Sequence, residues 1–290
     1  MAEEGRWQVA VDLGTSQAVA LVGRGAERGR ATVPSHGLQK GRVEDQEAAL
    51  KTVQRAVERA LVPFVLGLRQ GSLRPRDWQS MEVQVAVSCP EGETLGPFPL
   101  VPAPVVAVEE VQGRLGEKES FVLADFGEGS LDLAAVHLGE MLGWASLPFG
   151  SNYITADIAF GLALSLPEGE GKKRRYGQGG EDTPLLREIV EARMEEILLA
   201  ALPHLRQLMA GRGMAVALWT GEGSRLAGLM ERAEAVWGLA SRRIPLEEGV
   251  TLPALGLFRR MGGPYGGRDQ GPAKKEGRKR RFFTWLSDLL

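Results

Sequence analysis

Residues 9–16 have the sequence VAVDLGTS, and this stretch decides the fold class. Alternating apolar residues lead into an aspartate and a Gly-Thr-Ser turn, and apolar residues resume at 18–22. The pattern predicts two short strands joined as a β-hairpin. Backbone N–H groups and the hydroxyls of Thr15 and Ser16 suit a phosphate, and the Asp12 carboxylate suits a magnesium ion held through water. Taken alone, the motif is also compatible with an ordinary hairpin turn.

The same arrangement returns 113 positions later in the chain. Residues 121–130 (FVLADFGEGS) predict a buried strand, an acidic residue and a glycine turn, and a second strand is expected at 131–138. A third apolar strand, 215–219, ends in the glycine loop TGEGS before a helix whose N-terminus favours anions. Three such loops predict two related lobes that face each other around an anion-binding site.

Helical spacing of apolar residues covers four segments, 44–62, 153–165, 184–209 and 226–238. A further strand is expected at 82–88, where Cys-Pro-Glu-Gly ends the alternation. Residues 96–104 contain four prolines and are expected to form a connector. Because strands and helices alternate along the chain, the predicted fold class is α/β.

Composition excludes several classes of protein. The 290 residues are enough for two compact lobes, and 43% are hydrophobic, which excludes a disordered chain. One cysteine and three histidines can build neither a disulfide scaffold nor a zinc cluster. The acidic start and the lack of an 18-residue apolar run predict neither a signal peptide nor a transmembrane helix. We therefore expect a soluble protein of a reducing compartment. The basic C-terminal end on an acidic body indicates a partner for the tail, either a membrane surface or a polyanion. Of these we expect the membrane and no nucleic acid.

Basic residues are concentrated at the C-terminus. Residues 271–290 carry a net charge of +4, whereas residues 1–270 carry −6. On a helix, six apolar side chains would share one arc of about 160°, with Arg280 and Arg281 just upstream: Phe282, Phe283, Trp285, Leu286, Leu289 and Leu290. This pattern predicts a flexible linker at 263–280 and, at 281–290, an amphipathic helix that binds an anionic membrane surface. The alternative is a terminal helix that docks on the protein's own core, which the polar linker disfavours.

The three glycine loops, in this order, resemble the two phosphate loops and the adenosine loop of the actin/Hsp70 ATPase superfamily. Within it, the chain is most similar to FtsA, the bacterial division protein that tethers FtsZ filaments to the membrane. Supporting segments lie at 35–41, 150–159, 170–177, 191–197 and 252–257. The resemblance implies two ribonuclease-H-like lobes around a nucleotide cleft. The first lobe would be formed by residues 1–112 with 248–262, and the second by residues 113–247.

The resemblance also implies roles for particular residues, with ATP and Mg²⁺ as cofactors. Asp12, Gly14, Thr15 and Ser16 would hold the β-phosphate, and Asp125, Gly127, Gly129 and Ser130 would face the γ-phosphate. Asp12 and Asp125 would hold the metal through water. Glu170 and Lys173 would border the adenine and ribose, and Gly221, Gly223 and Ser224 would lie along the adenosine. For Lys173 the alternative is an ordinary solvated charge run, because it lies within KKRR at 172–175.

The chain also departs from the family. Glu128 and Glu222 stand where the family's loops usually have glycine, and Glu222 is expected to crowd the adenosine. The short spacing between the loops implies that the extra subdomains are reduced or missing, as in the short ethanolamine-utilisation chaperone of the superfamily. Residues 102–108 contain no acid or amide that could orient water. Asp125 and Glu128 are thus weak catalytic candidates, and any hydrolysis is expected to be slow.

The resemblance and the tail lead to one preferred function and two alternatives. The preferred function is an FtsA-like protein on the cytoplasmic face of the membrane, with an FtsZ-like or other division protein as partner and with self-association into filaments. The first alternative is a soluble Hsp70-like ATPase or reactivating chaperone. The second is a degenerate adaptor that no longer binds nucleotide.

Overall fold

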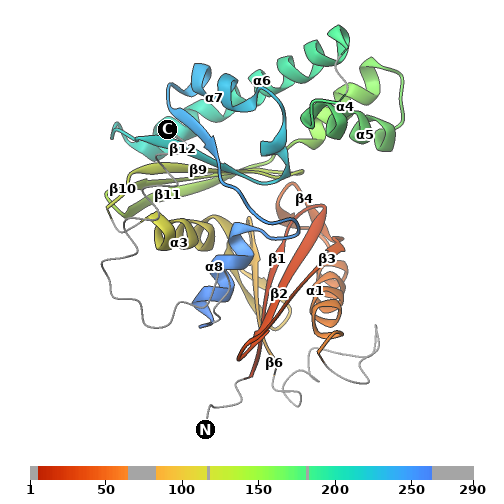
Figure 1. Cartoon of the computed structure of the whole chain (residues 1–290), viewed down its shortest axis with the longest axis vertical. Coiled ribbons are helices and arrows are strands. Elements are labelled where there is room, and N and C mark those ends of the chain that lie inside the picture. Colours follow the sequence, from red (N-terminus) through yellow and green to blue (C-terminus); the bar gives the residue numbers. More distant parts are fainter. Residues whose placement is uncertain (1–5, 65–82, 116–117, 181–182, 263–290) are drawn as a thin grey trace.

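The computed structural model describes residues 6–64, 83–115, 118–180 and 183–262, and these residues form two lobes, each built on one sheet (Figure 1). The strands of the first sheet run in the order β3-β2-β1-β6-β8-β7. Their bounds are β1 (Trp7–Leu13), β2 (Gln17–Arg24), β3 (Glu27–Pro34), β6 (Val83–Cys89), β7 (Thr94–Leu95) and β8 (Phe98–Pro102). A small hairpin, β4 (Leu38–Gln39) and β5 (Arg42–Val43), precedes helix α1 (Gln46–Leu61), which covers one face of this sheet.

The second sheet repeats the layout of the first. Its order is β11-β10-β9-β12-β13, with bounds β9 (Phe121–Phe126), β10 (Leu131–His137), β11 (Glu140–Leu147), β12 (Val216–Thr220) and β13 (Ala240–Arg243). In each lobe an antiparallel hairpin, β1–β2 or β9–β10, lies beside a parallel strand, β6 or β12. The predicted repeat of two hairpins is therefore confirmed.

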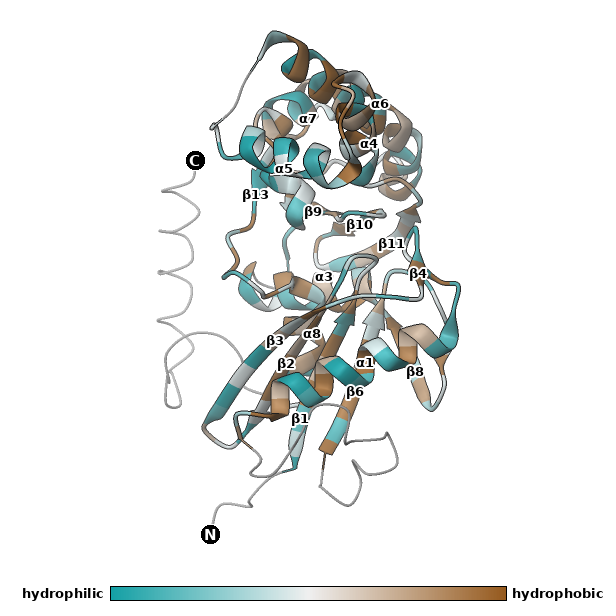
Figure 2. Cartoon of the chain, turned by 90° about the vertical axis from the view of Figure 1, so that its right-hand side faces the viewer, coloured by the Kyte–Doolittle hydropathy of each residue, from teal (hydrophilic) through white to brown (hydrophobic). Residues whose placement is uncertain are grey.

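One face of the second sheet is covered by a helical layer. Its members are α4 (Asn152–Gly161), α5 (Leu166–Gly177), α6 (Pro184–Met209), the short 3₁₀ turn η1 (Glu222–Arg225) and α7 (Leu229–Trp237). Hydrophobic residues lie on the strands of both sheets and on the helix sides that face them, whereas hydrophilic residues cover the outside (Figure 2). This segregation is the expected result of removing apolar surface from water.

Two crossing helices lie between the sheets and connect the lobes (Figure 1). Helix α3 (Ala103–Leu115) follows the last strand of the first sheet but packs on the second sheet through residues such as Val108 and Val111. Helix α8 (Leu252–Arg260) follows the second sheet but packs on the first through Leu255 and Phe258. Each lobe thus supplies a helix to the core of the other lobe.

Several expected elements differ from those observed. The proline-rich stretch 96–104 is not a connector, because β8 and the start of α3 lie within it. Pro99 and Pro102 lie within β8, paired with Thr94 of β7 and Cys89 of β6, respectively. Pro104 is tolerated because it stands in the first turn of α3, where no intrahelical N–H bond is needed. The expected helix at 153–165 ends at Gly161, and the one at 226–238 begins only at Leu229.

Candidate functional site

The first glycine loop joins β1 to β2 and places Asp12 at the boundary between the lobes. The Asp12 carboxylate accepts hydrogen bonds from Ser88 Oγ of β6 (3.1 Å) and from Thr251 Oγ1, the residue that caps α8 (2.7 Å). Burial raises the pKa of Asp12 to about 6, although both hydrogen bonds lower it. Asp12 is therefore held in position by a strand and a helix that are distant in the sequence.

The second loop joins β9 to β10 and contributes two acidic residues. Burial raises the pKa of Asp125 well above its ordinary value, and the nearby charges of Asp132 and Asp12 raise it further. Asp132 lies on β10, where Ser146 and Ser130 donate hydrogen bonds to its two carboxylate oxygens. Burial still raises the pKa of Asp132 to about 7. Three carboxylates thus share a buried region between the lobes.

The third loop, after β12, packs directly on the second. Gly221 has φ +83°, and a Cβ there would lie 2.4 Å from Asp125 Oδ1, so this position requires glycine. Gly223 is equally close to the Phe126 ring, and Ser224 Oγ donates to the Gly221 carbonyl (2.6 Å). The predicted adenosine loop therefore lies beside the predicted γ-phosphate loop.

Glycines also bring the first and second loops into contact. A Cβ on Gly129 would lie 2.5 Å from Thr15 Oγ1, and a Cβ on Gly41 would lie 3.2 Å from Ser130 Oγ. The Gly41 N–H donates to Thr15 Oγ1 (3.2 Å), which ties the β4–β5 hairpin to the same place. Because the loops already touch, phosphates bound between them would have to separate Thr15 from Gly129.

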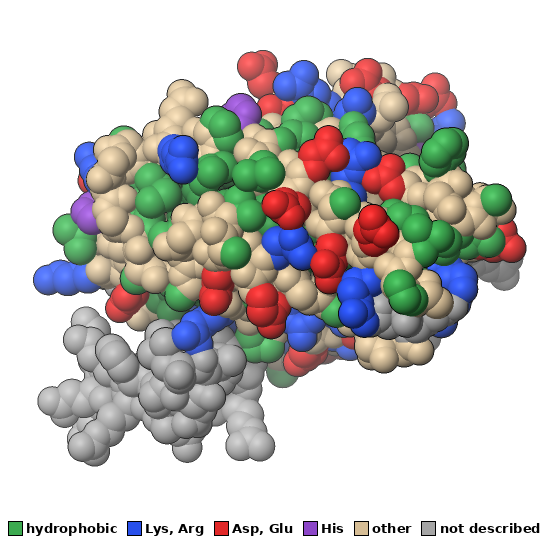
Figure 3. All heavy atoms as spheres, turned by 90° about the horizontal axis from the view of Figure 1, so that it is seen from above, with side chains coloured by type: hydrophobic (Ala, Val, Ile, Leu, Met, Phe, Trp, Pro, Cys, Tyr) green, Lys and Arg blue, Asp and Glu red, His purple; other side chains and the backbone are tan. Residues whose placement is uncertain are grey.

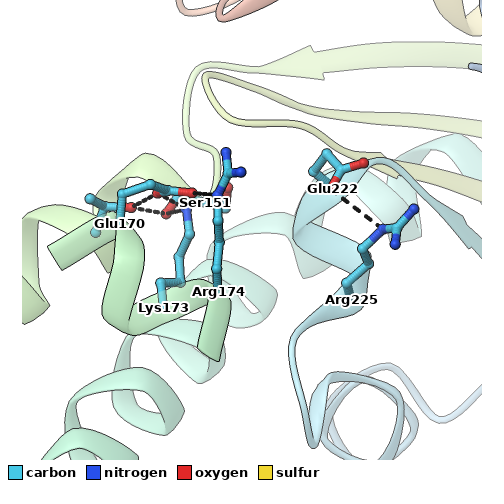
Figure 4. Close-up of polar contacts among 7 residues, drawn as sticks. Ser151, Glu170, Lys173, Arg174, Glu222 and Arg225 are labelled. Carbon is cyan, nitrogen blue, oxygen red and sulfur yellow. Dashed lines mark hydrogen bonds and ion pairs between the residues drawn. The ribbon is translucent and has the colours of Figure 1, made fainter. Parts of the chain in front are cut away.

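Helix α5 supplies the predicted adenine and ribose contacts (Figure 4). Lys173 is buried, pairs with Glu170 (2.7 Å) and donates to the Ser151 carbonyl (3.1 Å), so it is not part of a solvated charge run. Burial raises the pKa of Glu170, but hydrogen bonds from Lys173, Thr155 and Arg174 outweigh burial and lower the pKa to about 2. Glu170 is therefore a fixed anion at neutral pH.

Glu222 was expected to crowd the adenosine, and that expectation stays a prediction. Its side chain is 76% exposed and pairs with Arg225 (3.4 Å), so the carboxylate is neither desolvated nor unbalanced. Figure 4 shows the Glu222–Arg225 pair on the opposite side of a gap from Glu170, Lys173 and Arg174. The reason is local: Gly221 and Gly223 occupy the crowded positions, and the intervening side chain points outward.

Glu128, the second departure from glycine, is exposed. The loop instead uses its backbone here, because the Glu128 carbonyl accepts from the Asn152 N–H (3.0 Å) at the start of α4. A Cβ on Gly150 would lie 2.2 Å from the same carbonyl, so the backbones pack closely. The weak catalytic candidacy of Asp125 and Glu128 stays a prediction.

Sequence reasoning missed three residues of this site, Asp132, Arg174 and Arg225. Asp132 lies two positions beyond Ser130, which directly precedes β10, and this period-2 spacing could have placed both on one face. Arg174 and Arg225 each directly follow a predicted contact residue, Lys173 and Ser224 respectively. Figure 4 shows the Arg174 guanidinium beside Ser151, where a planar base could stack against it, whereas the Arg225 side chain points away from α5 and pairs with Glu222.

The residues present fit a hydrated divalent cation. Within the described ranges no Lys or Arg forms an ion pair with Asp12, Asp125 or Asp132, and their raised pKa values reflect this lack of compensation. The side-chain oxygen of Asn152, beside the second loop, is buried without a partner. In the same part of the chain, no three His, Cys, Asp or Glu groups are placed to bind one metal directly. A Mg²⁺ ion held through water is consistent with this arrangement.

Membrane contact was expected at 280–290, which lies outside the described residues. Among the helices that the structure describes, none is both long and apolar enough to span a bilayer.

Comparison with known proteins shows the fold. No protein-family model and no curated protein matches the sequence. Among solved structures, the ethanolamine utilization protein EutJ from Carboxydothermus hydrogenoformans is 17% identical, with a TM-score of 0.60 over 89% of this chain and 94% of EutJ. A chain of the PilM–PilN type IV pilus biogenesis complex is 15% identical, with a TM-score of 0.61 over 91% of this chain and 100% of that chain. MreB5 of Spiroplasma citri, bound to ADP, is 14% identical, with a TM-score of 0.60 over 89% of this chain and 97% of MreB5.

Proposed function

We propose that this chain, which has the actin-like ATPase fold, binds Mg²⁺–ATP between its lobes and acts as an FtsA-like membrane tether for a cytoskeletal or division partner. The observation that carries the nucleotide part is the uncompensated cluster of Asp12, Asp125 and Asp132, bordered by three glycine loops. Several structures of this fold contain a nucleotide, including MreB5 with ADP or AMPPNP.

The residues divide the work of holding the nucleotide. The backbone N–H groups of the first and second loops face the phosphates, and a Mg²⁺ ion held by Asp12, Asp125 and Asp132 through water neutralises phosphate charge when bound. Glu170 accepts hydrogen bonds from ribose hydroxyls, and Lys173 holds Glu170 in place. Arg174 stacks on the base.

Isothermal titration of the full chain with ATP, with and without Mg²⁺, tests the nucleotide part. We expect one site whose affinity depends on Mg²⁺ and on Asp132, because the ion balances that carboxylate. Asp132→Asn should weaken binding at least tenfold, whereas the exposed control Glu119→Gln should bind as the parent does. Absence of binding at millimolar Mg²⁺–ATP would favour the degenerate adaptor.

The membrane part rests on the tail sequence. Each Lys or Arg near an anionic surface contributes about 1 kcal/mol, screened over about 8 Å at physiological salt, and the apolar arc adds partial burial. Neither contribution anchors firmly alone, but both together do. We place the protein on the cytoplasmic face of the membrane. PilM in complex with PilN is an example of this fold in complex with another protein.

Co-sedimentation with anionic liposomes tests the membrane part. Trp285→Glu should release the full chain from liposomes, whereas Thr284→Glu places the same charge on the polar side of the arc and should weaken binding less. A chain truncated after Gly271 should remain in the supernatant.

The alternative is a soluble ATPase or reactivating chaperone of the EutJ kind. EutJ, at 17% identity, is one of the solved structures with this fold. Magnesium-dependent ATP binding without any liposome binding would select this alternative, because such a chaperone has no need of an amphipathic terminus.

A further inference from the structure

The edge of the second sheet lacks the usual protection against strand pairing. Strand β11 is the outermost strand and pairs with β10 on one side only. Its sequence, EMLGWASL, contains one charged residue, at its start, and no lysine or proline. Edge strands that must stay unpaired usually carry charges or proline, because their free N–H and C=O groups otherwise accept another strand.

A hollow of about 510 Å³ lies between β11 and the C-terminal part of α6. Met141, Leu142, Trp144 and Leu208 supply apolar lining, and the volume is in the range of sites that hold a small molecule or a few side chains. Figure 3, viewed from the side of α6, shows hydrophobic side chains at the surface toward the left, where histidines are also exposed. Glu140, His204 and Gln207 add polar lining, so the hollow offers both apolar and polar groups beside the free edge of β11.

A bulge in β11 shapes this site. The register with β10 pairs Val136 with Met141 and Ala135 with Gly143, so Leu142 is an extra residue. A bulge redirects side chains, and here the consecutive residues Met141 and Leu142 both line the hollow. The strand is regular again from Gly143 to Leu147. This regular segment is long enough to pair with a short peptide.

The hairpin tip before β11 carries a residue that is unfavourable for stability, in addition to the unprotected strand edge. Leu138 has φ +51° and is 66% exposed, although this turn position normally takes Gly, Asn or Asp. A non-glycine residue at positive φ is strained, and because this apolar side chain is exposed, no burial offsets the cost in stability. Together with the hollow, Leu138 extends the apolar surface along the sheet edge.

Charge at the rim indicates the chemistry of the occupant. Arg212, just after α6, lines the hollow and is exposed. Glu140 also lines the hollow, but within the described ranges no ion pair joins it or another acidic side chain to Arg212. An acidic residue on an incoming chain would complete this pair at the rim, where charges govern specificity and rate of association.

We propose that β11 and the hollow beside α6 bind an extended peptide of a protein partner by strand addition. The peptide pairs with the outer edge of Gly143–Leu147, inserts an apolar side chain between Met141, Leu142 and Leu208, and places an acidic residue on Arg212. Glu140 pairs with His137 at the end of the sheet remote from the glycine loops, so the hollow lies away from the nucleotide site. The other end of the segment borders that site, because Ser146 donates to Asp132. This inference goes beyond the proposed function and does not depend on ATP binding.

Random twelve-residue peptides displayed on phage, selected against the full chain, provide the probe. Enriched sequences should alternate apolar and polar residues and carry an acidic residue at one end. As synthetic fluorescent peptides, they should lose at least tenfold in affinity with Arg212→Glu. Arg206→Glu makes the same charge change on α6 outside the hollow and should leave the affinity unchanged. Unchanged melting temperatures would show that both variants fold.

Amide hydrogen exchange then separates strand addition from mere side-chain binding. With bound peptide, exchange in residues 143–147 should slow at least tenfold, while exchange in the edge strand β3 should not change. Three results would overturn the proposal: no enriched peptide, peptides that tolerate Arg212→Glu, or unchanged exchange in β11. A dimer of the full chain that Leu142→Lys converts to a monomer would also overturn it, because the occupant would be a second copy.

Discussion

The two lobes have the same strand order but differ at equivalent edges. Strand β3 closes the first sheet and carries Glu27, Arg28 and Arg30, with Pro34 at its end, and α1 packs beside it. Strand β11 closes the second sheet at the corresponding position with a nearly uncharged sequence. The first edge is thus protected and the second is not. The difference teaches that a repeated fold can keep its core while one copy exposes a surface for binding.

The hairpins of the two lobes also differ in their acidic residues. The first contributes Asp12, which has two hydroxyl donors from distant elements. The second contributes both Asp125 and Asp132, and the only hydrogen bonds the structure describes for these two carboxylates come to Asp132, from Ser130 and Ser146. The second lobe therefore carries more uncompensated charge, and it should depend more on a bound cation.

The largest expected effect tests whether both hairpins hold the nucleotide. At a hundredfold excess over its dissociation constant, Mg²⁺–ATP should stabilise the parent protein by about 2.7 kcal/mol. Asp12→Ala should abolish this gain, because the first lobe has no second carboxylate in its hairpin, while the apo variant stays folded. Thermal unfolding with and without ligand measures both quantities. If Mg²⁺–ATP stabilised the Asp12 variant as much as the parent, the second lobe would bind the nucleotide alone.

The pH dependence of stability sharpens the same contrast. A carboxyl whose pKa is raised by folding binds more protons in the native state, so its contribution to the free energy of unfolding falls as pH rises. For Asp132 the fall should run from about pH 4 to its native value of about 7. Asp132→Asn should therefore stabilise the apo protein at pH 8 by on the order of 2 kcal/mol, and little at pH 4.

Urea denaturation at the two pH values measures this effect. Asp12→Asn, whose native pKa is about 6, provides the matched variant from the first lobe and should show the smaller gain. Equal stability of the Asp132 variant and the parent at pH 8 would contradict the assignment of uncompensated charge.

The crossing helices offer a third test, because each contains a glycine with a close neighbour. A Cβ on Gly256 of α8 would lie 1.9 Å from the Val106 carbonyl of α3, whereas a Cβ on Gly113 of α3 would lie 1.9 Å from the flexible end of Arg259. Overpacking against backbone costs about 1–3 kcal/mol and the gain in helix propensity is about 1 kcal/mol, so Gly256→Ala should destabilise by up to about 2 kcal/mol. Gly113→Ala should be neutral or stabilising. Chemical denaturation compares the two variants.

The smallest expected effect concerns Glu222. Because its carboxylate is exposed and paired with Arg225, its removal changes an interaction of less than about 1 kcal/mol. Glu222→Gly should tighten ATP binding by no more than about fivefold, since it frees Arg225 to stack on the base. Titration calorimetry measures the change. Weaker binding instead would mean that Glu222 contacts the nucleotide.

Hairpins were predictable from sequence because their information is local. Alternating apolar residues and a Gly-Thr-Ser or Gly-Glu-Gly turn specify β1–β2 and β9–β10 within two short segments, 7–24 and 121–137. The long helix α6 matched its expected bounds, 184–209, because its apolar period persists over seven turns and Thr183 caps its start. The strand β8 was missed because prolines mask it, and only its partners β6 and β7 make the pairing visible.

The sequence by itself determined the hairpins, the glycine loops and the candidate residues Asp12, Asp125 and Gly221. Only the tertiary structure decided which side chains meet: Thr251 caps α8 and bonds Asp12 across 239 positions, and Gly221 packs on Asp125. It also decided that Lys173 is buried while its neighbour Arg174 stays exposed. The physical reason is the distance along the sequence over which each interaction acts. Turn chemistry and periodicity act between neighbours in the chain, whereas burial, pKa and the contact between lobes depend on elements that the fold brings together from distant positions.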